Sequence, residues 1–151
     1  MPKIDPIRCA CLSATERPLL NKLYKIHGSA MRTSDAGEVW VARAGEIIGG
    51  LSLTPVPDGQ WLTGLLVAPD WRGKGVARLL IDHACGAERT WLFCHPDLQG
   101  FYERLGFMVN EDLPQTLADR LARYRRSKPL LAMVRDQSSA AGSSPGNSTS
   151  V

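Results

Sequence analysis

The sequence lacks any long apolar run. No stretch approaches the roughly 18 residues that a membrane-spanning helix needs, and residues 1–6, MPKIDP, contain no apolar segment of the kind that secretion signals carry. We therefore expect a cytoplasmic protein without a membrane span. With 151 residues, of which 44% are hydrophobic and 22% charged, the chain has the size and composition of about one globular domain.

Cysteine is scarce and shows no metal-binding spacing. The four cysteines are Cys9, Cys11, Cys85 and Cys94. In a chain without an export signal, thiols are expected to stay reduced. Cys9 and Cys11 would share one face of a strand, but a structural zinc site normally needs four ligands. The sequence therefore predicts neither a disulfide framework nor a bound metal.

Charged and aromatic residues are missing from the end of the chain. Residues 138–151 contain six serines, two glycines and one proline, and none of their side chains is charged or aromatic. Such a composition cannot bury enough apolar surface to order itself. We expect one domain over residues 1–136 and a disordered, serine-rich tail over residues 137–151.

Positive charge is concentrated in one segment. Between Leu113 and Lys128 there are five Arg or Lys residues and one Asp, a local charge of +4, whereas the whole chain carries +3. This segment supports one alternative function, a module that binds nucleic acid or an acidic partner. The pI of 8.8 and the absence of a recognition motif disfavour nucleic acid as that partner.

Hydrophobic periodicity separates helices from strands along the chain. Apolar alternation between turn residues predicts three strands of an antiparallel meander and three later strands, at 38–43, 47–54, 60–67, 90–94, 107–109 and 129–135. Helical spacing predicts four helices, the first N-capped by Thr15, at 15–27, 76–86, 98–105 and 113–121. The order predicts an α/β (α+β) fold with a mixed, mostly antiparallel central sheet flanked by helices.

The segment from Leu65 to Ala77 carries the clearest chemical signal. A predicted strand runs into a turn that contains Gly73 and Gly75 and then into a helix. Without side chains at the two glycines, the backbone can approach an anion closely, and the N-terminus of the helix favours negative charge. Arg72 and Lys74 add two positive charges. The pattern is typical of a pyrophosphate-binding loop.

Two familiar phosphate-binding loops do not fit this spacing. A P-loop has Ser or Thr after its lysine and a glycine five residues before it, whereas Gly75 follows Lys74 and Pro69 stands at the earlier position. The dinucleotide fingerprint has three glycines in an early βαβ unit, and here two glycines follow a meander. The loop therefore belongs to another class.

Arg72, Gly75 and Ala77 match the signature of the GNAT superfamily of acyl-CoA-dependent N-acyltransferases: Arg or Gln, two residues, Gly, one residue, then Gly or Ala. Residues 67–69, Val-Ala-Pro, match the usual lead-in, and Tyr102, which precedes the Gly-Phe pair at 106–107, matches a second motif of the family. The chain thus resembles the GNAT superfamily over residues 7–135.

The resemblance implies how coenzyme A would be held. Leu65, Leu66 and Val67 would pair with the pantetheine arm as an added strand does. The pyrophosphate would lie on the backbone N–H groups of Arg72, Gly73, Lys74, Gly75, Val76 and Ala77. Gly64 supports this placement of the pantetheine arm independently of the resemblance, because a glycine inside an apolar strand often marks a bulge or a close backbone approach. A loosely packed strand position is the alternative explanation.

The resemblance also implies acetyl transfer from acetyl-CoA, the cosubstrate, to a primary amine of a small molecule or protein. The amine must lose a proton before it attacks the thioester. The strands at 60–67 and 90–94 carry no carboxylate, so His95 is the candidate base, with a structural or capping role before Pro96 as the alternative. Tyr102 would donate a hydrogen bond or a proton to the departing thiolate. The missing carboxylate keeps a coenzyme A-binding protein without transferase activity as an alternative.

The acceptor pocket is expected from the first helix and the loop after it, residues 19–35, with Tyr24 and Arg32 as substrate residues. The resemblance implies acetyl-CoA and an amine acceptor as partners. The sequence leaves the question of a homodimer undecided, and no membrane partner is expected. Cys94 and His95 are neighbours on a strand and would point to opposite faces, which disfavours a thiol nucleophile. Packing roles are predicted for other side chains, namely His27, His83, Trp40, Trp61, Trp71 and Trp91.

Overall fold

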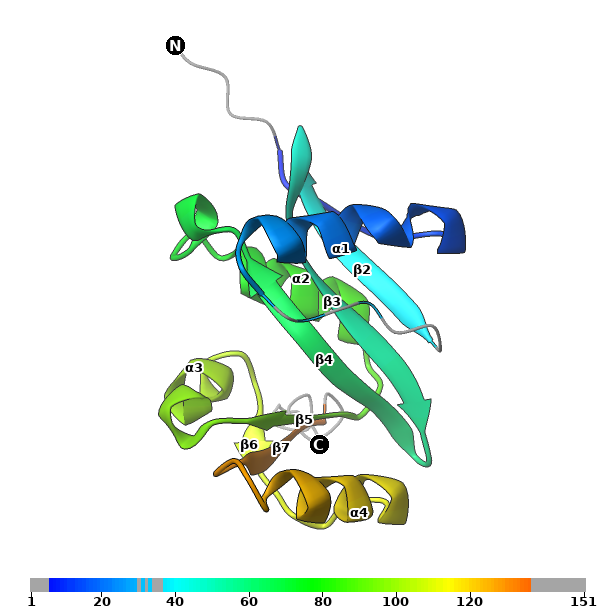
Figure 1. Ribbon diagram of the computed structural model, residues 1–151, viewed down its shortest axis with the longest axis vertical. Coiled ribbons are helices and arrows are strands. Elements are labelled where there is room, and N and C mark those ends of the chain that lie inside the picture. Colours follow the sequence, from blue (N-terminus) through cyan, green and yellow to red (C-terminus); the bar gives the residue numbers. More distant parts are fainter. Residues whose placement is uncertain (1–5, 30, 32, 34–36, 137–151) are drawn as a thin grey trace, which may run out of the picture. The chain divides into compact units, whose positions relative to one another are not determined.

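The structure is a computed structural model that describes residues 6–29, 31, 33 and 37–136. Within this part of the chain, seven strands lie in one sheet of order β1-β2-β3-β4-β5-β7-β6 (Figure 1). The strands are β1 (Arg8–Cys11), β2 (Glu38–Ala44), β3 (Glu46–Val56), β4 (Gly59–Val67), β5 (Thr90–Cys94), β6 (Met108–Val109) and β7 (Leu131–Arg135). The helices are α1 (Arg17–Ile26), α2 (Val76–Cys85), α3 (Gln99–Glu103) and α4 (Gln115–Tyr124).

The sheet is mixed, as the sequence predicts. β1 pairs with β2, β2 with β3, β5 with β7, and β6 with β7, each time antiparallel. β4 and β5 are parallel, with Gln60 opposite Thr90 and Trp61 opposite Trp91. The predicted fold class is confirmed, and the predicted strands agree with the observed ones to within two residues at most ends. The predicted tail at 137–151 lies outside the described residues.

The described chain divides into two compact units. The first comprises Met1–Thr54 and Leu62–Ala84, and the second comprises Pro55–Trp61 and Cys85–Val151. The strand β4 therefore contributes its start to the second unit and its remainder to the first. No helix among the described residues has the length and apolarity that a membrane crossing requires.

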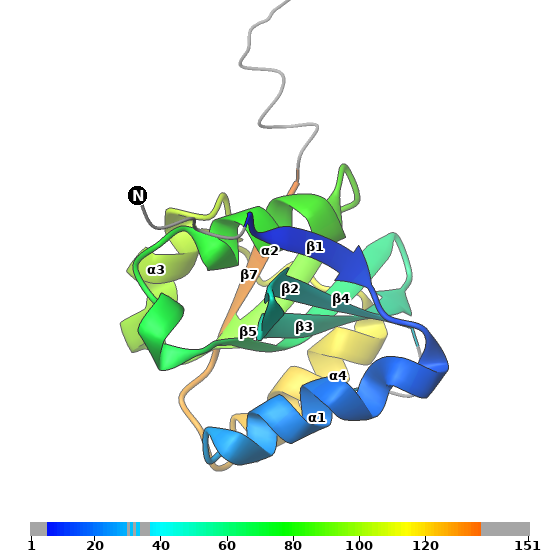
Figure 2. The same cartoon turned by 90° about the horizontal axis from the view of Figure 1, so that it is seen from above.

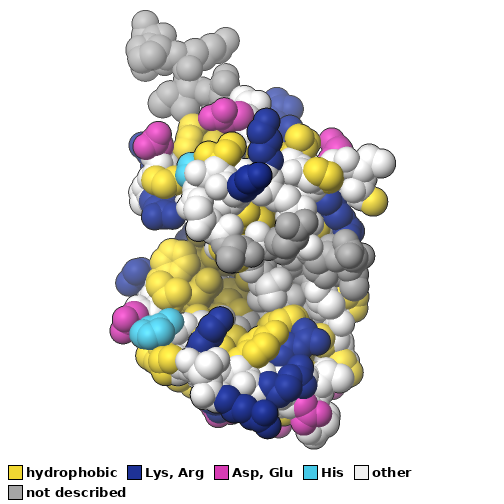
Figure 3. Space-filling model, viewed as in Figure 1, with side chains coloured by type: hydrophobic (Ala, Val, Ile, Leu, Met, Phe, Trp, Pro, Cys, Tyr) yellow, Lys and Arg dark blue, Asp and Glu magenta, His cyan; other side chains and the backbone are white. Residues whose placement is uncertain are grey.

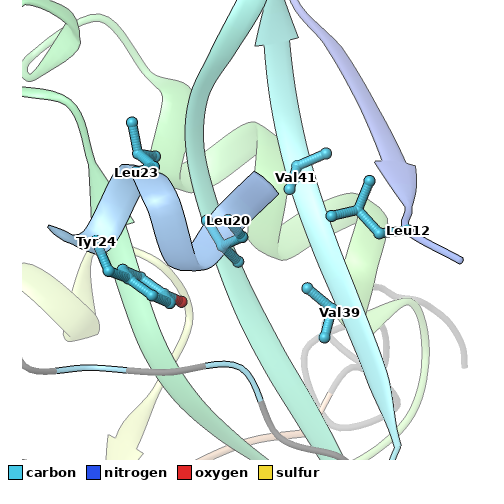
Figure 4. Packing of buried hydrophobic residues seen from close by; sticks show 6 residues of the cluster. All are labelled: Leu12, Leu20, Leu23, Tyr24, Val39 and Val41. Atoms are coloured by element: carbon cyan, nitrogen blue, oxygen red, sulfur yellow. The ribbon is translucent and has the colours of Figure 1, made fainter. Parts of the chain in front are cut away.

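In the first unit, α1 and α2 lie on opposite faces of the meander (Figure 2). Leu20, Leu23 and Tyr24 of α1 pack with Leu12, Val39 and Val41 in a buried cluster (Figure 4). The predicted N-cap at Thr15 is wrong by one residue, because α1 is N-capped by Glu16. Ser13 precedes a 3-10 turn, and the Glu16 carboxylate accepts hydrogen bonds from the Ser13 hydroxyl at 2.9 Å and its N–H at 3.3 Å. This Ser-x-x-Glu pair is a capping box, which provides more hydrogen-bond partners for the free N–H groups at a helix start than a single hydroxyl does.

In the second unit, α4 covers one face of β5 and β7. Leu117 of α4 is buried in a cluster with Trp61, Trp91 and Val134. Successive side chains of β5 alternate between the faces of the sheet, so Trp91 and Phe93 share the face toward α4. Cys94 is buried, and its thiol lies 3.6 Å from the sulfur of Met133 on β7. Because β5 ends at Cys94 and His95 follows it as the N-cap of a 3-10 turn, the expected opposite-face placement of these two residues on one strand stays a prediction.

Candidate functional site

The loop after β4 begins with a buried, hydrogen-bonded residue and is exposed to solvent where it approaches α2. Ala68 is buried, and its N–H donates to the carbonyl of Ile48 at 2.7 Å. A 3-10 turn, Pro69–Trp71, follows. The Arg72 Nε then donates to the Val67 carbonyl at 3.1 Å, which turns this side chain back onto the end of the strand. These bonds hold the loop in one conformation before α2 begins.

The two glycines of the loop adopt backbone conformations that L side chains rarely take. Gly73 has φ +77° and Gly75 has φ +81°, and a Cβ on either would meet nothing within 4 Å. The Gly75 carbonyl accepts the first α2 hydrogen bond, from the Leu79 N–H at 3.1 Å. The N–H groups of Val76 and Ala77 precede that bond and have no acceptor inside the helix. The loop thus presents exposed, positively polarised backbone to an anion.

Gly64 lies within β4, next to the residues expected to bind pantetheine. Its φ is +69°, and its carbonyl accepts a hydrogen bond from the Tyr24 hydroxyl at 2.6 Å. A Cβ at Gly64 would lie 2.8 Å from the same hydroxyl oxygen. The close backbone approach expected at this glycine is therefore made by the side chain of Tyr24. Leu65, Leu66 and Val67 follow as half-buried strand residues.

Tyr24 itself is fully buried in the core cluster of the first unit. Burial raises the pKa of this phenol, so it stays protonated and remains a donor to Gly64. Because its side chain has no exposed surface, any effect on an acceptor would act through the backbone at Gly64. Arg32, the other expected substrate residue, lies outside the described residues.

An open cavity of about 610 Å³ lies beside α1, in the region where the sequence predicts the acceptor pocket. Its walls come from α1 and from the segment after it, with Asn21, Lys22, Lys25, Ser29 and Met31 among the lining residues. His27, at the end of the same helix, is exposed, as is His83 on α2. The predicted packing roles of these two histidines are wrong, because each lies at the margin of its helix's apolar face.

Tyr102 belongs to the second unit and lies among aromatic rings. The rings of Phe101 and Phe107 contact it edge-on, with centroids 5.0 and 5.8 Å away. Burial, and secondly the charge of Cys94, raise the pKa of Tyr102 to about 12. Proton transfer from such a phenol to a free thiolate would be uphill by about 5 kcal/mol. A hydrogen bond to sulfur is the chemistry that this tyrosine can supply.

The raised pKa of Tyr102 predicts a measurable alkaline destabilisation. A phenol whose folded pKa exceeds its unfolded value stabilises the fold below pH 10, and this contribution is lost as the pH rises from 10 through about 12. In this window, unfolding free energy should fall more steeply for the wild type than for Tyr102→Phe, by up to about 1.4 kcal/mol per pH unit. Urea denaturation at several pH values measures both slopes, and parallel curves would contradict the burial argument.

His95 caps the short turn that follows β5. Its Nδ1 accepts a hydrogen bond from the Asp97 N–H at 3.1 Å, and the Asp97 carboxylate lies 3.4 Å from the same nitrogen. In the neutral ring this arrangement assigns the proton to Nε2, which then donates. Action as a base at Nδ1 would require release of the cap. The geometry therefore agrees with the alternative, capping role, and leaves Nε2 as a donor at an exposed position.

The four tryptophans divide between core and surface. Trp61 and Trp91 are buried in the second unit, as expected. Trp40 and Trp71 are only half-buried, and Trp71 lies in the 3-10 turn of the loop instead of in a strand. The Tyr24 contact with Gly64 was not foreseen either, because the glycine alone signals a close approach without naming the residue that makes it.

Comparison with known proteins identifies the family. Residues 35–109 match the family model of the acetyltransferase (GNAT) domain. No curated protein matches the sequence. Solved structures share the fold at low identity. A GNAT-family acetyltransferase from Staphylococcus aureus Mu50 is 15% identical with a TM-score of 0.62, and the match covers 87% of this chain and 99% of that one.

Two further structures extend the likeness to proteins whose ligands or substrates are named. The Escherichia coli ribosomal-protein-S18-alanine N-acetyltransferase is 18% identical, with a TM-score of 0.59 over 86% of this chain and 93% of that one. N-acetylglutamate synthase from Neisseria gonorrhoeae, complexed with coenzyme A and N-acetyl-glutamate, is 17% identical, with a TM-score of 0.61 over 88% of this chain and 35% of that one. The family match, the sheet order and the open loop after β4 together make this chain a member of the GNAT acetyltransferase superfamily.

Proposed function

We propose that the protein transfers an acetyl group from acetyl-CoA to a primary amine by direct attack of the amine on the thioester. The observation that carries this proposal is the loop after β4, in which Arg72 to Gly75 are exposed, include two glycines and lead into the N-terminus of α2. Charge and backbone polarity both favour a pyrophosphate there. That the Neisseria gonorrhoeae relative was solved with coenzyme A supports the same ligand here.

In this proposal the residues of the chain bind and orient, and they contribute little proton transfer. The backbone of Leu65 to Val67 lies along the pantetheine arm, and Arg72 to Ala77 hold the pyrophosphate. Acetyl-CoA supplies the acyl group as a thioester. The amine nitrogen bonds to the carbonyl carbon, the carbon–sulfur bond breaks, and the amine loses one proton while the thiolate gains one. Tyr102 donates a hydrogen bond to the sulfur, and His95 either donates through Nε2 or, once uncapped, accepts the amine proton.

A thermal shift experiment tests whether the loop binds coenzyme A. At about one hundred times its dissociation constant, a ligand raises the unfolding free energy by roughly 2.7 kcal/mol. Acetyl-CoA and CoA should raise the unfolding midpoint, whereas ATP, which lacks the pantetheine arm, should raise it less. A shift of equal size with ATP, or no shift with either coenzyme, would sink the proposal.

Release of free thiol from acetyl-CoA in the presence of amines then separates transfer from binding alone. The absence of a carboxylate from β4 and β5 favours the alternative of a coenzyme A-binding protein without transferase activity. That alternative predicts the thermal shift without amine-dependent thiol release. The proposed transferase predicts both.

A further inference from the structure

Aromatic and arginine side chains form a linked group on the second unit, which runs from the buried Trp61 to exposed side chains of α4. We call it the arginine–aromatic surface, and its members are Trp61, Phe93, Arg120, Arg123 and Tyr124. The ring centroids of Trp61 and Phe93 are 5.5 Å apart, and Phe93 meets Tyr124 edge-on at 6.3 Å. The Arg120 guanidinium lies over the Trp61 ring, 4.6 Å from its centroid. The surface thus has an apolar base and a positively charged margin.

The two arginines of this surface have no carboxylate partner within the described part of the chain. Other arginines of the unit do: Arg125 pairs with Glu111, and Arg89 with Asp136 at 2.8 Å. Arg120 and Arg123 are three residues apart, so they are neighbours on α4. Lys and Arg side chains gather over α4 in the space-filling view (Figure 3). This leaves two adjacent cations available to an external anion.

Arg120 differs from an ordinary solvated arginine in how it is held. It is half-buried, and its contact with the Trp61 ring restricts the guanidinium. A side chain that is already ordered loses less entropy when it binds a carboxylate or phosphate. Tyr124 beside it is 41% exposed and Phe93 is half-buried, so an apolar part of a ligand would also find contact.

We propose that the arginine–aromatic surface binds the anionic group of the amine acceptor. The inference rests on the proposed function and names the acceptor class: amines that also carry a carboxylate or phosphate, with an apolar portion between. Phe93 stands on β5, two residues before His95, so the surface adjoins the chain segment that carries a candidate catalytic residue. A fork-shaped guanidinium pairs with either anion.

Binding of matched ligand pairs tests this proposal without requiring turnover. Isothermal titration calorimetry would compare phenylalanine with phenylalanine amide, and phosphoethanolamine with ethanolamine. The anionic member of at least one pair should bind at least tenfold more tightly to the wild type, and the pair that shows the difference identifies carboxylate or phosphate. Arg120→Gln should reduce this difference to within twofold, and Arg120→Lys should retain part of it.

Lys128→Gln is the matched control, because Lys128 is an exposed cation outside the arginine–aromatic surface. It should keep the wild-type preference. No binding of either pair, equal affinities within both pairs, or an equal loss in Arg120→Gln and Lys128→Gln would overturn the proposal. The thermal shift with coenzyme A and the thiol-release assay test the proposed function separately, so its failure can be distinguished from the failure of this inference.

Discussion

Replacing Gly64 by alanine should lower the unfolding free energy by about 3 kcal/mol. A non-glycine residue at φ +69° costs roughly 1–2 kcal/mol. The new Cβ would also lie 2.8 Å from the Tyr24 hydroxyl oxygen, a contact that one of the two groups must relieve. Tyr24 is fully buried and bonded to the Gly64 carbonyl, so its displacement leaves that carbonyl unsatisfied, at about 1–3 kcal/mol. Chemical denaturation measures the loss.

Gly28→Ala separates backbone strain from the Tyr24 contact. Gly28 has φ +68°, and a Cβ there would meet nothing within 4 Å. This variant should therefore lose only about 1–2 kcal/mol. Tyr24→Phe removes the hydroxyl, so adding Gly64→Ala to that background should cost less than it does in the wild type. Equal losses in Gly64→Ala and Gly28→Ala would contradict the assigned role of Tyr24.

Most of the fold follows from local patterns in the sequence. Alternating apolar residues at 38–43 and 47–54, with Gly45 between them, match the observed hairpin of β2 and β3. The start of the first helix differs from the N-cap predicted at Thr15 because Ser13 and Glu16 form a capping box around a 3-10 turn, and α1 begins only after that turn. His27 and His83 were misassigned because a period of 3.6 residues does not say how wide the buried stripe is.

The candidate site combines a segment that is contiguous in sequence with contacts between residues that lie far apart in the chain. The glycine loop from Arg72 to Ala77 is contiguous in sequence, so spacing alone could indicate it. Tyr24 and Gly64 are 40 residues apart, and Arg120 lies over a tryptophan 59 positions earlier in the chain. Contacts at such separations depend on how the elements pack, and no periodicity within one element encodes them.

Gly75→Ala should weaken coenzyme A binding by between tenfold and a hundredfold. A Cβ at Gly75 meets no protein atom within 4 Å and would extend into open space beside the start of α2. Under the proposed function the pyrophosphate lies at this loop. A bound pyrophosphate would have to withdraw from the backbone N–H donors there. The loss of one charge-assisted hydrogen bond, at about 1.5–3 kcal/mol, accounts for the expected loss. Calorimetric titration with CoA measures the affinity.

Gly86→Ala provides the control, because Gly86, like Gly75, has a positive φ and open space around an added Cβ. Gly86 follows the end of α2, has φ +56°, and would also place its Cβ in open space. Both variants should lose roughly 1–2 kcal/mol of unfolding free energy from backbone strain. CoA affinity should fall only in Gly75→Ala, because Gly75 directly precedes α2, where unpaired N–H groups attract an anion, whereas Gly86 follows the other end of that helix. An equal fall in both variants would mean that general destabilisation, and not loss of the anion site, weakens binding.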